Sequence, residues 1–483
     1  MQLYDKDLLS MQEVRELVEA AKEAQKELAN MSQSQVDHIV RAIADAGVRN
    51  ARRLAEMAHE DTGFGKVEDK IIKNIFGSRG VYEYVKDMKT VGELERDEEK
   101  KVRTIAVPVG VIAGLVPSTN PTSTALYKAE IAIKAGNAIV FSPHPTALRC
   151  ISETVKVIRQ AISEAGGNEN LVSCITIPTM EATDNLMRHR DVAMILATGG
   201  SAMVRAAYSS GTPAIGVGPG NGPAYLEKTC DLPLAVKRIM DSKTFDNGTI
   251  CASEQSIICD EDMVPAVRAE MEKQGAYFLN ESEREKLGRY ILRANGTMNP
   301  EIVGRSVETI ARLAGLTDVP ATARVLVAAE DGVGRGHPYS NEKLGPILAF
   351  YTAENYEKVC EKVCEILHYE GAGHTFSMHT NDDKMVDYFA RRVPASRVMV
   401  NTPSALGGIG GTTALQPALT LGCGAVGGSA TSENVGPMHL LNLRYVAYGL
   451  KELDEIRASV PDCSDGVCRT APSLENIDVD DIV

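Results

Sequence analysis

The feature that most constrains the fold is an alternation of short apolar runs with helix-patterned segments. A nearly continuous apolar run from Val107 to Val116 is followed by the loop Pro117 to Pro121. A helical segment from Thr122 to Ala135 then ends at Gly136, and Ala138 to Ser142 is a second apolar run. Continuous apolar runs are typical of strands buried on both faces, and a helix between two of them predicts a βαβ unit. We therefore expect a parallel sheet.

The alternation continues and predicts an α/β fold with a doubly wound sheet in the first half of the chain. Before that sheet, Ser10 to Ala58 has the apolar spacing of helices. After Pro223 the pattern restarts, which predicts a second α/β domain. Further strands are expected near 172–177, 192–197, 255–258, 325–328, 347–351, 375–379 and 398–400. The expected domains are 1–223, 224–416 and a return segment, 417–483.

Composition argues against several classes of partner. The chain has 483 residues and a formal charge of −14, which would repel nucleic acid and anionic membranes. No run approaches the roughly 18 apolar residues of a membrane span. The ten cysteines include no pair with the spacing of a zinc site, and the histidines supply no metal triad, so no metal is expected. These features favour a soluble cytoplasmic protein with small-molecule partners.

Cys251 is the candidate nucleophile. It lies in the segment Asn247 to Ala252, between a flexible turn at Gly248 and a β-type run from Ser253 to Cys259. A reactive thiolate needs nearby backbone N–H groups and an open approach, which a glycine allows. Taken alone, the cysteine is better explained as a small buried hydrophobic residue.

Two loops at the ends of predicted strands supply further candidates. Asn120, in the loop that follows the first strand of the βαβ unit, could donate to a carbonyl oxygen, and with the N–H of Cys251 it would form an oxyanion hole. Loss of one such donor costs about 3 kcal/mol. The turn Thr198 to Ser201 opens a helix, where free N–H groups could receive a dinucleotide phosphate. An Asx-turn and an ordinary strand-to-helix turn are the alternatives.

In this order, the Asn120 loop, the Thr198 to Ser201 turn, Phe245 to Gln255 and Glu342 to Pro346 resemble the signatures of the aldehyde dehydrogenase superfamily. The residues of the Asn120 loop and of Phe245 to Gln255, together with Thr420 to Gly424, are similar to those of the coenzyme A-acylating branch. The resemblance implies a Rossmann-type cofactor domain, a catalytic α/β domain and a small β oligomerisation arm. It also implies NAD and coenzyme A as cofactors.

Carried over to this chain, the resemblance implies Cys251 as nucleophile, Asn120 as oxyanion donor and Glu342 on the nicotinamide ribose. The branch oxidises a short aldehyde such as acetaldehyde or propionaldehyde reversibly to acyl-CoA, through a thiohemiacetal and a thioester. The other cofactor-binding positions are Thr198, Gly199, Gly200, Ser201, Gly218, Ser142, Pro143 and His144. The expected substrate pocket contains Thr119, Ile250, Gly408, Cys423 and Gly424, the glycine-rich segment 407–428 forming one wall.

Two departures from the hydrolytic relatives refine the expectation. Val217 falls where they have a glutamate that activates water, and a valine cannot deprotonate water. A thiol ionises about seven pH units more readily than water, so coenzyme A can dispense with that base. Around His144 the lysine and glutamate that hold the adenosine ribose are missing, which leaves NADP as well as NAD open.

Several alternatives stay open at this stage. They are a hydrolytic dehydrogenase that makes the free acid, an acylating enzyme for another small aldehyde such as sulfoacetaldehyde, a cysteine hydrolase, and a non-catalytic scaffold. The resemblance also implies an arm strand at about 95–107, a partner strand at about 440–448, and a dimer or tetramer. Packaging in the lumen of a bacterial microcompartment, with shell or cargo contacts through the tail, is a further expectation.

Overall fold

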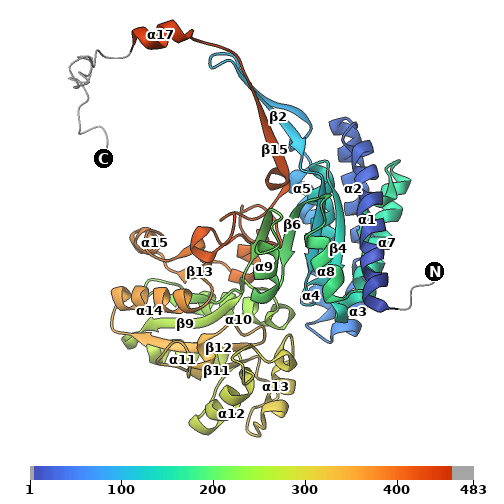
Figure 1. The fold of residues 1–483 in the computed structure, drawn as a ribbon. Helices are drawn as coiled ribbons and strands as arrows, with labels where there is room; N and C mark the ends of the chain where they lie inside the picture. Colours follow the sequence, from blue (N-terminus) through green and yellow to red (C-terminus); the bar gives the residue numbers. More distant parts are fainter. Residues whose placement is uncertain (1–4, 460–483) are drawn as a thin grey trace. The chain divides into compact units, whose positions relative to one another are not determined.

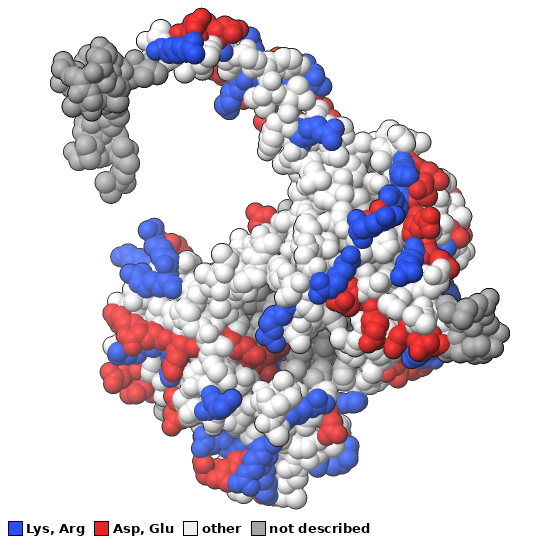
Figure 2. Space-filling model, in the orientation of Figure 1, with Lys and Arg blue, Asp and Glu red and all other residues white. Residues whose placement is uncertain are grey.

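The computed structural model describes residues 5–459, so the tail expected to contact a shell lies outside the described residues. The chain divides into two units, which are described separately. Of the described residues, the first contains 5–91 and 108–442, and the second contains 92–107 and 443–459. Within 5–459, no helix is both long and apolar enough to cross a bilayer. Lysine and arginine are interspersed with acidic residues on the face shown in Figure 2.

The first unit contains a five-stranded sheet that is parallel throughout. Its strands, in spatial order, are β5 (Val172–Cys174), β4 (Ala138–Pro143), β3 (Val111–Val116), β6 (Val192–Thr198) and β7 (Ala214–Val217). The chain proceeds from β3 outwards to β4 and β5 on one side, and then to β6 and β7 on the other. Ligands of open α/β sheets bind at such a reversal, outside the carboxyl ends of the strands.

Helices cover this sheet (Figure 1). The helices in contact with its strands are α1 (Lys6–Leu28), α6 (Pro121–Lys134), α7 (Leu148–Glu164), α8 (Met180–Met187) and α9 (Ser201–Tyr208). An outer layer packs on α6 and consists of α2 (Gln33–Arg49), α3 (Ala51–Thr62), α4 (Val67–Ile75) and α5 (Val81–Val85). Helix α6 is buried along its whole length, because it lies between the sheet and the helices α2, α4 and α7. Asn120 directly precedes the first turn of α6, so the buried helix holds the backbone of Asn120 in place.

A second, seven-stranded sheet in the same unit is also parallel throughout. Its order is β10 (Ala276–Phe278), β11 (Val325–Ala329), β12 (Ile347–Ala353), β9 (Glu254–Asp260), β8 (Gly222–Leu226), β13 (Gly373–His379) and β14 (Ala395–Val400). Successive residues of a strand point to opposite faces: Ile257 belongs to a core with Val236 and Met271, and Ile258 belongs to a separate core with Leu287 and Phe389.

The helices on this second sheet are α10 (Leu232–Thr244), α11 (Val264–Lys273), α12 (Glu281–Ile291), α13 (Val307–Ala314), α14 (Tyr356–Tyr369), α15 (Asp383–Ala390) and α16 (Ser404–Gly408). Two parallel, helix-covered sheets and a separate small sheet confirm the predicted fold class. The domain boundary expected after residue 223 lies inside β8, which belongs to the second sheet.

One predicted strand, Val107 to Val116, is wrong in detail. The run divides into β2 (Val102–Pro108) and β3, with a break at Gly110. Gly110 has φ +130° and donates its N–H to the Asn137 side chain instead of continuing a ladder. The apolar pattern crosses this break because both flanking segments carry apolar residues.

The second unit contains a three-stranded sheet. The order is β1 (Gly92–Asp97), β2 and β15 (Leu441–Ala447), and the helix α17 (Leu453–Ala458) follows. The single arm strand expected at 95–107 is thus an antiparallel hairpin, with its turn between Asp97 and Val102. The charged residues of that turn interrupt the strand, and β15 takes the place expected for the partner strand.

Candidate active site

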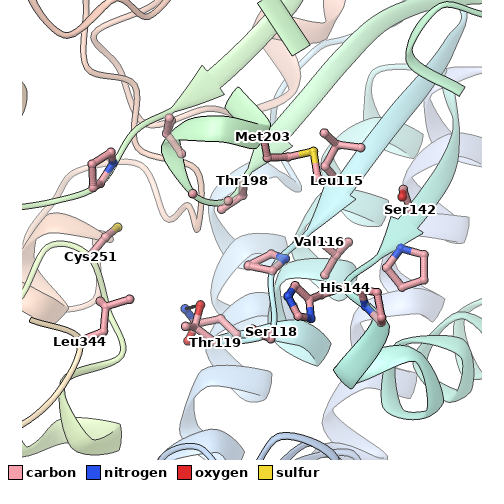
Figure 3. Close-up of a pocket in the computed structure, with 18 of the residues that line it drawn as sticks. Leu115, Val116, Ser118, Thr119, Ser142, His144, Thr198, Met203, Cys251 and Leu344 are labelled. Atoms are coloured by element: carbon pink, nitrogen blue, oxygen red, sulfur yellow. Dashed lines mark hydrogen bonds between the residues drawn. The ribbon is translucent and has the colours of Figure 1, made fainter. Parts of the chain in front are cut away.

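A cavity of about 480 Å³ lies at the strand reversal of the five-stranded sheet. The residues that end β3, β4 and β6, which are Val116, Pro143 and Thr198, all line it. Cys251 lines it from the chain that enters the second sheet. Figure 3 shows Cys251 and Leu344 at one end, and Ser142 and His144 at the other. The cavity is therefore long enough to separate a reaction end from a cofactor end.

Cys251 follows an unusual turn. Asp246, Asn247 and Gly248 are consecutive left-handed residues, with φ of 48°, 51° and 75°. This conformation is uncommon outside glycine and is often found at functional sites. Burial, with smaller contributions from Glu342 and Cys423, raises the pKa of the Cys251 thiol to about 12, although Arg397 opposes the shift. The resting cysteine is therefore a thiol.

Asn120 lies beside the cysteine loop. Its Nδ2 donates to the carbonyl oxygen of Thr249 at 3.2 Å, and its Oδ1 accepts a hydrogen bond of 2.6 Å from Lys73. Thr249 precedes Cys251 by two residues. Asn120, Thr249 and Cys251 all line the cavity. An amide in this place can donate to an oxygen bonded to the carbon that Cys251 attacks.

Glu342 reaches the same end of the cavity from the loop before β12. Its Oε1 accepts the N–H of Gly220 at 2.9 Å, and its own N–H donates to Glu370 at 2.6 Å. Burial and then the neighbouring Glu370 raise the pKa of Glu342 to about 8. Among the described residues that line the cavity, Glu342 is the one carboxylate.

The far end of the cavity has the form of a nucleotide cradle. Gly199 and Gly200 precede α9, and a Cβ added at Gly200 or at Gly218 would meet nothing within 4 Å. Backbone N–H groups at a helix start can therefore approach a phosphate without hindrance. Ser142 is hydrogen-bonded to Thr183 at 2.8 Å, and His144 is exposed at the rim. This donor set fits a dinucleotide.

Eleven of the residues predicted to be catalytic or to bind cofactor or substrate line this cavity, as does Val217: Thr119, Asn120, Ser142, Pro143, His144, Thr198, Gly199, Gly200, Gly218, Cys251 and Glu342. Ser201, Ile250, Gly408, Cys423 and Gly424 do not. Gly408 lies behind the nucleophile, since its Cβ would be 2.8 Å from the Ala252 Cβ. Ile250 and Cys423 are 3% and 2% exposed. From the glycine-rich segment 407–428, Leu419 lines the cavity.

The sequence analysis missed several wall residues. Pro178, Thr179 and Met180 follow β5, and Met298 and Leu344 complete the wall at the cysteine end. The position of 178–180 after a strand was a usable signal, because ligand-binding loops of such sheets follow their strands. No local pattern distinguishes Met298.

His374 lies in an unusual environment. It is fully buried on β13, its Nε2 has no hydrogen-bond partner, and burial together with Arg397 lowers its pKa to about 3. It is therefore neutral. The one group with metal-ligand spacing among residues 5–459, Glu330, Asp331 and His337, lies outside the cavity wall.

The model of the family described as "Aldehyde dehydrogenase family" matches residues 4–288. The chain belongs to the aldehyde dehydrogenase family. This confirms the family that the motifs indicated.

Among curated members of the aldehyde dehydrogenase family, the bifunctional aldehyde-alcohol dehydrogenase of Escherichia coli K12 is 44% identical over 440 residues, which are 90% of this chain and 49% of that protein. The chain thus spans about half the length of that relative.

Solved structures agree with this assignment. A probable aldehyde dehydrogenase from Listeria monocytogenes is 62% identical with a TM-score of 0.93, covering 94% of this chain and 100% of that one. An acetylating aldehyde dehydrogenase from Geobacillus thermoglucosidasius is 50% identical with a TM-score of 0.92, covering 93% and 99%.

Two propionaldehyde dehydrogenases are more distant. The enzyme of a Clostridium phytofermentans fucose-utilisation microcompartment is 28% identical, with a TM-score of 0.81 and coverage of 90% and 97%. The Rhodopseudomonas palustris enzyme, solved with bound CoA and an acylated cysteine, is 27% identical, with the same TM-score of 0.81 and coverage of 90% and 97%.

Proposed function

We propose that this chain oxidises a short-chain aldehyde to the acyl-CoA, reversibly, with NAD and coenzyme A. One observation carries the proposal: Val217, 3% exposed, lines the cavity wall, and the family resemblance implies that hydrolytic members have their water-activating glutamate at this position. Glu342, the one carboxylate among the described residues of the wall, accepts a hydrogen bond from the Gly220 N–H. Water is therefore a poor acceptor for the acyl group, and a thiol is a good one.

Cys251 attacks the aldehyde carbon in the first half-reaction, and the oxygen becomes an alkoxide. The Asn120 amide and the Cys251 N–H stabilise that charge in a site from which water is largely excluded. Because the resting cysteine is a thiol, its proton must leave before or during the attack. When bound, NAD⁺ supplies the acceptor for the hydride that leaves the same carbon.

The product of this half-reaction is a thioester on Cys251. The thiolate of coenzyme A then attacks the acyl carbon, the bond to the Cys251 sulfur breaks, and the cysteine is released. The same two donors stabilise the second oxyanion. The dinucleotide and coenzyme A enter the same cavity. NADH must therefore leave before coenzyme A binds, and we expect ping-pong kinetics.

The nucleotide end supports this assignment. Thr198, Gly199, Gly200 and Gly218 would hold the phosphates, and Glu342 would bind the nicotinamide ribose. No carboxylate lines the adenosine end, among the described residues, so the 2′-phosphate of NADP and the ribose phosphate of coenzyme A are not repelled there. We assign the aldehyde to the end formed by Thr119, Met298, Leu344 and Leu419, around Cys251.

The decisive test measures NADH formation from acetaldehyde and NAD⁺, with and without coenzyme A, in the native protein and in Cys251→Ala. Turnover that requires both the thiol and Cys251 establishes the acylating reaction. Sustained turnover without coenzyme A, with acetate as product, would assign the chain to the hydrolytic type. Sulfoacetaldehyde and propionaldehyde in parallel assays identify the preferred aldehyde.

The second unit favours a homo-oligomer, either a dimer or a tetramer. Strand β15 pairs with β2 on one side, and its side chains Leu443 and Tyr445 are 43% and 64% exposed. An apolar edge strand of this kind is a pairing surface. Light scattering of the native protein and of Tyr445→Glu measures the expected loss of association.

The cytoplasm, and within it the lumen of a bacterial microcompartment, is the proposed location. The support is the relative from the Clostridium phytofermentans microcompartment. Deletion of 473–483 is expected to abolish co-purification with shell proteins. Unchanged co-purification would remove the tail from this proposal.

A further inference from the structure

A buried cluster of charges lies behind the active site, outside the cavity wall. Two lysines of α4, Lys70 and Lys73, share one oxygen of Asp246, with Nζ to Oδ2 distances of 3.0 and 2.5 Å. The three residues are 3%, 2% and 0% exposed. Burying charged groups costs desolvation free energy, so we expect a cluster of this kind to have a structural or functional role.

The two lysines differ in what else they hold. The Lys73 ammonium donates to Asn120 Oδ1 at 2.6 Å, to Asp246 Oδ2 at 2.5 Å and to Thr249 Oγ1 at 2.9 Å. An ammonium has three N–H donors, and all three are used. Lys70 contacts Asp246 and the backbone oxygen of Thr119, at 3.3 Å, and not the Asn120 side chain.

This contact determines which way the Asn120 amide points. A lysine has no acceptor, so the atom of Asn120 that faces Lys73 must be the carbonyl oxygen. The Nδ2 group therefore faces the Thr249 carbonyl, at 3.2 Å, and Thr119 Oγ1, at 3.3 Å, and both of these residues line the cavity. A neighbouring positive charge also polarises the amide, which strengthens its N–H groups as donors.

The same cluster holds the turn that presents the nucleophile. The Asp246 N–H donates to Asp69 at 2.7 Å, and Asp246 Oδ1 accepts the Lys66 N–H at 2.7 Å. These contacts tie the left-handed Asp246 to α4 and the residues before it. Two parts of the oxyanion hole, the Asn120 amide and the Cys251 loop, are thus held by one helix.

We propose that Lys73 is a positioning residue for aldehyde oxidation: anchored by Asp246, it holds Asn120 Oδ1 so that Nδ2 donates to the developing alkoxide. This inference rests on the proposed function. Lys73 does not line the cavity, so it acts through Asn120 and not on the substrate. The residue lies 47 positions before Asn120 in the chain.

The test compares Lys73→Met with Lys70→Met, because both remove a buried partner of Asp246 and only the first releases Asn120. We expect Lys73→Met to slow the single-turnover acylation of Cys251 about 10- to 100-fold, since removing one oxyanion donor costs about 10²- to 10³-fold. The KM for the aldehyde and the Kd for NAD⁺ should change little. Lys70→Met should lower the melting temperature similarly and slow acylation much less.

A double-mutant cycle separates positioning from general destabilisation. In an Asn120→Ala background, Lys73→Met should slow acylation by less than about threefold, because the donor it positions is already gone. Equal losses in the two lysine variants, or losses that multiply in the double mutant, would overturn the proposal. If Lys73→Met does not fold, Lys73→Gln is measured in the same cycle, since its amide can still donate to Asp246. A native protein that forms no NADH from any aldehyde would instead refute the proposed function.

Discussion

Gly220 lies directly against the backbone of Cys251. A Cβ at Gly220 would be 1.9 Å from the Cys251 carbonyl oxygen, which is far inside van der Waals contact. The N–H of the same glycine donates to Glu342 at 2.9 Å. One residue without a side chain thus sets the spacing between the nucleophile and the carboxylate of the wall.

Gly220→Ala should slow acylation of Cys251 about 100-fold, because the loop must shift and a misplacement of about 1 Å costs about that factor. Single-turnover NADH formation measures it. Gly218→Ala is the comparison from the same loop, since its Cβ would enter open space. It should weaken cofactor binding but leave the alkylation rate of Cys251 near that of the native protein. A native acylation rate in Gly220→Ala would contradict the model of a fixed loop.

Val217→Glu should introduce hydrolysis. A carboxylate at this wall position can activate water, and general bases contribute about 10²- to 10⁴-fold, so coenzyme A-independent acetate formation should rise at least about tenfold. Burial raises the pKa of a carboxyl group there, so the new activity should increase with pH. Val217→Gln has a similar shape without a base and should stay at background. Equal activity of the two variants would remove Val217 as the reason for thiol specificity.

The raised pKa of Cys251 predicts the pH dependence of its alkylation. With a pKa of about 12, the thiolate fraction, and thus the rate with iodoacetamide, should rise about tenfold per pH unit from about pH 7 to about pH 9, without a plateau. Glu342→Gln should accelerate the reaction chiefly above pH 8, because Glu342, with a pKa of about 8, carries its negative charge only there. Cys251→Ala gives the background. A plateau near pH 7 would mean a depressed thiol pKa.

His144→Glu should discriminate between the dinucleotides. His144 is exposed at the adenosine end, so the change should leave folding intact. A carboxylate there should raise the KM for NADP about tenfold by repelling the 2′-phosphate, and the KM for NAD less than about twofold. Added salt should reduce the difference. His144→Gln controls for loss of the imidazole, and an equal rise for both dinucleotides would show that the charge does not face the ribose.

Much of the fold could be predicted because buried parallel strands leave a local pattern. The βαβ unit around Asn120 and the strands β6, β9, β11, β12 and β14 each contain a short apolar run, and β13 has Phe376 and Met378 in alternation with polar residues. β8 was missed because Pro223 lies within it and reads as a breaker. The break at Gly110 was missed because the residues on both sides are apolar, and only the hydrogen bond to Asn137 reveals it.

The candidate site was predicted where a residue combines reactive chemistry with a place at a strand end. Asn120 and the turn at Thr198 meet that condition, Cys251 lies just before a strand, and Glu342 was implied by the family resemblance; all line one cavity. Gly408 and Cys423 were expected beside them because small residues cluster in that segment. They lie in the layer behind the wall, and composition carries no information about which layer a residue occupies.

The sequence by itself determined the family, the order of the motifs and the absence of a base at Val217, because each is a property of residue type and order. The tertiary structure alone decided the contact between Lys73 and Asn120, the approach of Gly220 to Cys251 and the pKa of the thiol. These depend on distances across segments that are far apart in the chain, and on how much water the packing removes. Neither the distances nor the extent of water removal can be predicted from a local stretch of residues.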